Sequence, residues 1–209
     1  MMRYRKHKAH PWHGIEIGKN APEELTAFIE IVSSDTVKYE VDKASGYLSI
    51  DRPQQFSNIV PALYGFVPQT YCGRKVAELT NAALGRDDIE GDHDPLDICV
   101  LTEKEVTHGD IIAQVRPIGG FGLLDLVLAD DKIIAVLKND MIYGQYTDIS
   151  QVPEAIVKRL LHYFTTYKDM PGDRQPRMVL TGTYGRQTAY DIIRRSAEDY
   201  NTEIRPLLE

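Results

Sequence analysis

The sequence is poor in cysteine and has no long apolar run. Its 209 residues include two cysteines, Cys72 and Cys99, which form neither a CxxC pair nor a disulfide ladder, as suits a reducing cytosol. The longest stretch without a charged residue, 53–73, contains three prolines and cannot span a bilayer. No segment near the start of the chain has the apolar region of a signal peptide. We therefore expect a soluble, cytoplasmic protein that does not bind membranes.

Positive charge is also scarce. The chain has 24 Lys and Arg residues against 31 Asp and Glu residues, which gives a formal net charge of −7. A nucleic-acid partner needs a basic surface, so this balance argues against one. It suits a protein that collects metal cations, provided that its acids cluster. The GxxxxGK[ST] motif does not occur, so a P-loop nucleotide site is excluded.

The composition is otherwise that of an ordinary globular protein, with 43% hydrophobic and 26% charged residues. It contains no internal repeat, low-complexity tract or linker that would divide the chain. We therefore expect one domain over 1–209, with a basic N-terminal extension at 1–22.

Periodicity predicts strands first and helices last. Two helices are predicted, from Pro153 to about Lys168 and from Arg186 to about Asn201, because their apolar residues recur at helical spacing. A long stretch, 53–94, reads as irregular. This order favours a β-barrel or curved sheet with helices packed on it. The predicted strands cover 27–32, 37–41, 47–50, 97–101, 111–118, 121–128 and 132–137.

The acids gather before one of these strands. Residues 87–97 contain six acids and no Lys or Arg. Asp92, Asp94 and Asp97 stand directly before an apolar strand, where Pro95 can bend the chain and bring them together. Two carboxylates about 4 Å apart repel by about 4 kcal/mol at an effective dielectric constant of about 20, so a cluster of them calls for divalent cations. All-oxygen ligands favour Mg²⁺ or Mn²⁺, with Ca²⁺ as the competitor.

Other side chains on regular elements could complete such a site. A second acidic pair, Asp125 and Asp130, lies at a strand and its turn. Cationic and phenolic side chains on strands and helix ends could donate hydrogen bonds to a phosphate. Together the two sets describe a cavity suited to phosphoryl transfer, with metal ions on one side and phosphate donors on the other. The candidate donors are Lys38, Arg52, Tyr64, Lys132, Tyr167 and Lys168.

At this point the sequence resembles family I of the soluble inorganic pyrophosphatases. The signature is Asp92-His93-Asp94-Pro95-Leu96-Asp97-Ile98, and the resemblance covers about 30–168. Six further blocks surround the signature in the expected order: FIEIV, KYEVDKASG, IDRP, PALYGFVP, ADDK and HYFTTYKD. The resemblance implies a mainly β (α+β) fold, an OB-like five-stranded β-barrel flanked by two C-terminal helices.

The resemblance also implies a reaction, the Mg²⁺-dependent hydrolysis of inorganic diphosphate to two phosphates by a metal-activated water. Mn²⁺ or Zn²⁺ are possible substitutes for Mg²⁺. Asp94 would be the general base. Glu40 would contact the residues that bind the metal and the substrate without binding either itself. The family forms homo-oligomers, either hexamers or dimers. The implied metal ligands are Asp92, Asp97, Asp125, Asp130 and, through water, Glu30. The implied phosphate ligands are Lys38, Arg52, Tyr64, Lys132, Tyr167 and Lys168.

The chain departs from the family pattern at four places. Val60 stands where many members have a tyrosine, Leu126 where bacterial members often have a glutamate, and His93 where a small residue is usual. The stretch before the signature, expected as an insertion loop at 65–91, is longer than in compact members. It could cap the mouth of the site or contact another subunit.

Two other functions are compatible with the predicted fold. An OB-like barrel can bind single-stranded nucleic acid through a basic groove and aromatic side chains, although the net charge argues against this. A metal-binding homologue without activity is the other alternative, against which the intact set of acids and donors argues.

Overall fold

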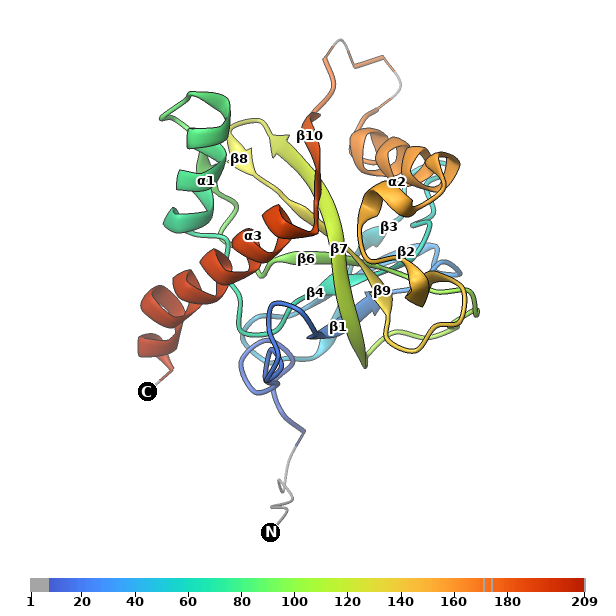
Figure 1. Ribbon diagram of the computed structural model, residues 1–209, viewed down its shortest axis with the longest axis horizontal. Helices are drawn as coiled ribbons and strands as arrows, with labels where there is room; N and C mark the ends of the chain where they lie inside the picture. The colour runs from blue at the N-terminus through green and yellow to red at the C-terminus, as the bar shows by residue number, and fades with distance from the viewer. Residues whose placement is uncertain (1–7, 171, 174, 209) are drawn as a thin grey trace.

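The structure, a computed structural model, describes residues 8–170, 172–173 and 175–208 (Figure 1). Residues 1–7, the start of the basic extension predicted from the sequence, lie outside the described residues. The strands are β1 (Leu25–Ile31), β2 (Val37–Val41), β3 (Leu48–Pro53), β4 (Leu63–Phe66), β5 (Glu90–Gly91), β6 (Asp97–Leu101), β7 (Ile111–Asp125), β8 (Leu128–Ala129), β9 (Lys132–Leu137) and β10 (Met178–Gly185). The α-helices are α1 (Arg74–Leu84), α2 (Glu154–Thr166) and α3 (Arg186–Asp199); short 3-10 turns at Tyr143–Gln145, Ile149–Gln151 and Arg205–Leu207 and a π turn at Tyr200–Ile204 complete the list.

Five strands close into a barrel in the order β1-β4-β6-β9-β7, and β7 pairs back onto β1. The neighbours are antiparallel except β6 and β9, which run parallel. The small strands β5 and β8 and the strand β10 extend the sheet from β7, while β2 and β3 form a separate hairpin. The OB-like five-stranded barrel expected from the sequence is therefore confirmed.

The barrel strands are held by a continuous apolar interior. The β6 sequence DICVL and the β9 sequence KIIAVL alternate side chains between two faces, and both faces are buried. Ile98 and Ile133 point into one cluster, Cys99 and Ile134 into another. These β-branched runs therefore position the first residue of each strand, Asp97 and Lys132, which are partners across the parallel ladder.

One long strand replaces two predicted ones. The expected strands 111–118 and 121–128 form the single strand β7, whose pairing with β9 shifts register between Pro117 and Gly119. This register shift is a β-bulge, which the neighbouring glycines accommodate. Gly119 has φ 157°, and a Cβ there would lie 2.5 Å from the carbonyl oxygen of Tyr184, so a side chain does not fit.

The sequence predicted an irregular stretch over 53–94, and this prediction was wrong. The stretch contains the barrel strand β4, the helix α1 and the short strand β5. β4 was missed because it is short and contains Gly65, where a Cβ would lie 1.9 Å from the carbonyl oxygen of Phe28 on the neighbouring strand. Strand β10 was missed as well, because most of its side chains are only partly buried and its sequence lacks a clear alternation.

Helix α1 lies in the segment 65–91, predicted as an insertion loop, and packs against α3 (Figure 1). Its first turn has no local capping residue. Instead, the Asp199 carboxylate at the end of α3 accepts hydrogen bonds from the backbone N–H groups of Gly73, Lys75 and Val76 at 3.0–3.2 Å. The helix start was therefore invisible to local sequence rules, because its cap comes from a residue more than a hundred positions away.

The two predicted C-terminal helices are present with ends within about two residues of the expected ones. Helix α2 buries Leu160 and Phe164, and α3 buries Ala189 and Ile193. None of the helices in the described part of the chain is long and apolar enough to cross a membrane.

The N-terminal segment 8–24 lies against the barrel as a strap. Trp12 is buried and donates its indole N–H to the carbonyl oxygen of Thr70 at 2.8 Å. The imidazole Nε2 of His10 lies 3.2 Å from the carbonyl oxygen of Lys43 in the β2–β3 hairpin. The strap thereby joins the hairpin to the segment that precedes α1.

Candidate functional site

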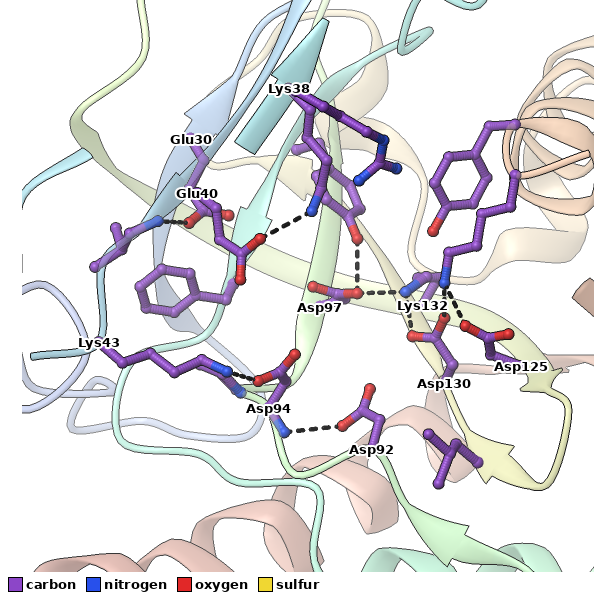
Figure 2. Close-up of a pocket in the computed structure, with 18 of the residues that line it drawn as sticks. Glu30, Lys38, Glu40, Lys43, Asp92, Asp94, Asp97, Asp125, Asp130 and Lys132 are labelled. Atoms are coloured by element: carbon purple, nitrogen blue, oxygen red, sulfur yellow. Dashed lines mark hydrogen bonds and ion pairs between the residues drawn. The ribbon is translucent and has the colours of Figure 1, made fainter. Parts of the chain in front are cut away.

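A cavity of about 520 Å³ opens at one end of the barrel, and every site residue proposed from the sequence lines it (Figure 2). Within the described residues, seven carboxylates and six cationic side chains face this space. The thirteen residues expected from the sequence are Glu30, Lys38, Glu40, Arg52, Tyr64, Asp92, Asp94, Asp97, Asp125, Asp130, Lys132, Tyr167 and Lys168. Of the segment 65–91, predicted as an insertion loop and described throughout, only Phe66 on β4 contributes to the lining.

The acids reach the cavity from the ends of strands. Asp97 is the first residue of β6, Asp125 the last of β7, and Asp130 lies between β8 and β9. Lys132 opens β9 opposite Asp97, and Tyr64 lies on β4, the other neighbour of β6. Strand register thus places residues that are far apart in the sequence at the same barrel end.

The acidic turn before β6 is held firmly rather than solvated. Asp92 accepts the backbone N–H of Asp94 at 3.0 Å, and His93 between them adopts φ 64°. The carbonyl oxygen of Asp94 accepts the N–H of Cys72 at 2.8 Å, and Thr70 Oγ1 accepts the N–H of Leu96 at 2.9 Å. These contacts fold the turn so that Asp92 and Asp94 face the same cavity as Asp97.

Lys132 is the electrostatic centre of the site. Its buried ammonium contacts the carboxylates of Asp97 and Asp130, and Tyr64 donates its hydroxyl to Asp97 Oδ2 at 2.6 Å (Figure 2). Burial opposes the charge of Lys132, yet Asp130 and Asp97 raise its pKa well above the ordinary value. Burial alone would raise the pKa of Asp130, but Lys132 and Lys168 lower it. The pKa of Asp97 stays raised, because burial and the repulsion of Asp130 outweigh Lys132.

At two other acids in the cavity, burial outweighs the attraction of the nearby lysines. Burial raises the pKa of Asp92 well above its usual range, and repulsion from Asp130 and Asp97 adds to this. Within the described ranges Asp92 takes part in no ion pair. Burial also raises the pKa of Glu30 to about 8, although Glu30 accepts the backbone N–H of Val41 at 2.7 Å. An oxygen-binding cation would relieve this strain, so the donor set fits a divalent ion.

The acids are not arranged around an ion as they stand. Among the residues that the structure describes, no three acidic, histidine or cysteine side chains have a geometry that could hold a metal together. The Lys132 ammonium lies between Asp97 and Asp130. A cation bound by these two carboxylates would therefore displace the ammonium, which is long enough to turn toward an anion in the same cavity.

The expected phosphate donors are paired with acids around the rim. Lys38 contacts Glu40 at 3.0 Å and Asp51 at 2.8 Å, and Arg52 contacts Asp51 at 2.6 Å. Lys168 contacts Asp125 at 2.8 Å, with Tyr167 beside it in the lining. Asp51 was not considered from the sequence, although it directly precedes Arg52.

Sequence reasoning also missed Lys43, Arg177 and Trp12 as residues of the lining. Lys43 contacts Asp94, Arg177 contacts Asp125 at 2.9 Å, and Trp12 from the strap forms part of the wall. Lys43 stands in the hairpin turn DKASG, where a lysine is typical of a solvated surface. Arg177 follows the HYFTTYKD block by several residues and is part of no motif. Only the folded chain brings these side chains to the acids.

Comparison with known proteins finds similarity to inorganic pyrophosphatases in the family model, the sequences and the solved structures. A family model described as inorganic pyrophosphatase matches residues 27–201. The inorganic pyrophosphatase of Chlamydia trachomatis serovar L2 is 48% identical over 196 residues, covering 92% of this chain and 94% of the relative. That of Chlamydia muridarum is 49% identical over 195 residues, covering 91% and 93%. The crystal structure of the Thermus thermophilus inorganic pyrophosphatase superposes with a TM-score of 0.76 at 27% identity, covering 93% of this chain and 99% of that one.

Proposed function

The chain belongs to the inorganic pyrophosphatase family and hydrolyses inorganic diphosphate, and from this we propose which of its residues do so and with which ion. The observation that carries the proposal is the single cavity in which seven described carboxylates meet six described cationic side chains. Such a cavity can bind cations and a polyanion at once. That combination suits cleavage of a phosphoanhydride, in which charge must be neutralised on several oxygens together.

Membership of the family makes a divalent metal the expected cofactor, and we propose Mg²⁺, with Mn²⁺ or Zn²⁺ as possible substitutes. Asp92, Asp97 and Asp130 would hold the first ions, Asp125 and Asp130 would hold an ion that arrives with the substrate, and Glu30 would contribute through water. When bound, such ions lower the pKa of a coordinated water and neutralise phosphate oxygens. The support is that Asp92, a half-buried residue of the cavity lining, takes part in no ion pair among the described residues.

Asp94 would act as the general base. Its carboxylate faces the cavity, is about 45% exposed and contacts the Lys43 ammonium, which keeps it directed over the neighbouring acids (Figure 2). It would take a proton from the attacking water while the other acids hold their positions. Asp97 is less free to do so, because Tyr64 and Lys132 already occupy its Oδ2 atom.

The cationic rim would bind the two phosphate groups. Lys38 and Arg52 line the cavity and are paired with Asp51, and Lys168 is paired with Asp125; all three can exchange these contacts for phosphate oxygens. Lys132 would do the same at the centre. Tyr64 and Tyr167 would add neutral donors, and Glu40 would keep Lys38 in place at 3.0 Å. Binding the leaving phosphate in this way lowers the barrier to its departure.

An OB-fold nucleic-acid-binding module is not favoured, because the cavity carries one more carboxylate than cationic side chains in the described residues and the chain has net charge −7. We also propose a single domain over 1–209, a cytoplasmic location and a homo-oligomer, either hexamer or dimer. Two buried free cysteines support the location. Exposed apolar side chains on the β2–β3 hairpin and after it support the oligomer, as Tyr47 is 75% and Phe56 66% exposed. Light scattering would report the mass of the assembly.

Release of phosphate from diphosphate, with and without Mg²⁺, tests the proposal. We expect turnover with Mg²⁺ and none above background in EDTA. The Asp97→Asn variant should need at least about ten-fold more Mg²⁺ for half-maximal rate, because it loses a charged ligand. The matched control is Asp88→Asn, an exposed acid paired with Arg86 away from the cavity, which should follow the wild type. An unchanged Mg²⁺ requirement in Asp97→Asn would remove Asp97 from the metal site.

A further inference from the structure

Arg177 is held against Asp125 by the fold. Its Nε atom lies 2.9 Å from Asp125 Oδ1, and its Nη2 atom lies 3.4 Å from Oδ2. The next residue, Met178, is buried and pairs directly with Asp125 across the β7–β10 ladder. The backbone N–H of Arg177 donates to Asp169 Oδ1 at 3.0 Å. Strand register and this hydrogen bond therefore keep the guanidinium at one edge of the cavity.

The guanidinium has capacity for a second partner. It lines the cavity and its side chain is 56% exposed. A guanidinium has five N–H donors in a planar fork, so the contact with Asp125 does not exhaust them. The fork matches two oxygens of one phosphate group, which a lysine ammonium cannot do.

This edge of the cavity is cationic before any metal binds. Lys168 lies 3.6 Å from Asp130, and Asp125 meets two cations, Arg177 at 2.9 Å and Lys168 at 2.8 Å. The following residue adds no negative charge, because it is Leu126, which is 71% exposed at φ 61° in the turn to β8. An anion can therefore be attracted here without help from a divalent ion.

We propose that Arg177 is a substrate-binding residue that contacts the terminal oxygens of diphosphate at the Asp125 edge of the cavity. The inference rests on the proposed function, and it adds a contact that is independent of metal. Diphosphate binding would turn the guanidinium from Asp125 toward the anion, leaving that carboxylate for the cation that enters with the substrate. Affinity for a diphosphate anion should then depend on Arg177 in EDTA as well as in Mg²⁺.

Titration calorimetry with imidodiphosphate, in which an NH group replaces the bridging oxygen, tests this in the full chain. In EDTA, Arg177→Gln should weaken binding about ten-fold or more, and Arg177→Lys should give an intermediate loss because it keeps the charge without the fork. The control is Arg86→Gln, since Arg86 makes the same two-point contact with Asp88 outside the cavity at 2.8 and 2.7 Å. It should bind as the wild type does.

The Arg177→Gln substitution made in an Asp125→Asn variant distinguishes two roles of Arg177: contact with the anion, or positioning of the Asp125 carboxylate. If Arg177 contacts the anion, Arg177→Gln should still cost about ten-fold there. If Arg177 only positions Asp125, no further loss follows, and the inference is overturned. Equal affinity of wild type and Arg177→Gln, with the melting temperature unchanged, also overturns it. Failure of the wild type to bind imidodiphosphate and to release phosphate would instead remove the proposed function itself.

Discussion

Replacing Asp94 with asparagine should lower kcat by about 10²- to 10⁴-fold, the range expected when a general base is lost. The amide keeps the shape of the side chain but cannot accept a proton from water. Asp92, Asp97 and Asp130 are untouched by the change, so Mg²⁺ binding should stay within about three-fold of the wild type. Steady-state phosphate release gives kcat, and calorimetric titration of Mg²⁺ gives the affinity.

The control for this variant is Asp88→Asn, which should leave both quantities unchanged because Asp88 is exposed and lies outside the cavity. A second comparison is Lys43→Gln, which removes the ammonium that directs Asp94 and should lower kcat by less than Asp94→Asn does. Wild-type turnover in Asp94→Asn would show that another group accepts the proton.

Replacing Lys132 with methionine should destabilise the metal-free protein by about 3–5 kcal/mol at neutral pH, because two buried carboxylates lose their cation. Mg²⁺ should restore more stability to this variant than to the wild type, since the ion supplies the missing charge between Asp97 and Asp130. Lower pH should recover part of the loss, because burial and mutual repulsion already raise the pKa of Asp97 and an unpaired carboxylate takes up a proton.

Urea unfolding in EDTA and in Mg²⁺ measures these changes. Lys138→Met is the matched control, because Lys138 follows the same strand but pairs with Glu24 at the surface, where an ion pair contributes about 0–1 kcal/mol. If Lys132→Met were as stable as the wild type in EDTA, the Lys132 ion pairs would not compensate the buried acids.

Sequence patterns predicted those elements whose signal is local. The strands β2, β6 and β9 were predicted with their observed ends, because β-branched residues fill faces that the barrel buries. Strand β4 and helix α1 were not. The signal for β4 is a close approach of two backbones at Gly65, and the cap of α1 is Asp199 on another helix. Neither contact leaves a pattern in the neighbouring sequence.

The same division applies to the cavity. The acids of the signature and the motif-borne donors were all predicted and line the cavity, because each belongs to a short motif that can be recognised in the sequence itself. Lys43, Arg177 and Trp12 were not predicted, since each reaches the cavity through a hairpin turn, a strand register or the N-terminal strap. Their residue types are common at protein surfaces, and only their tertiary contacts distinguish them.

The structure shows what surrounds two of the residues that depart from the family pattern, Val60 and His93. Val60 is fully buried in the apolar cluster that contains Tyr64, so it fills space that a larger phenol could not occupy without movement. His93 has φ 64°, a conformation that favours glycine, and its Nδ1 atom lies 2.8 Å from the Tyr71 hydroxyl. This contact ties the acidic turn to the segment before α1.

The central claim is that the acids of this cavity share divalent cations. Its most direct test is an anomalous difference map from crystals of the full chain soaked in Mn²⁺. The account predicts a peak within about 2.5 Å of carboxylate oxygens from at least two of Asp92, Asp97 and Asp130, with the Lys132 ammonium displaced from between them. A map with no peak in the cavity, and with Lys132 still joining Asp97 and Asp130, would contradict it.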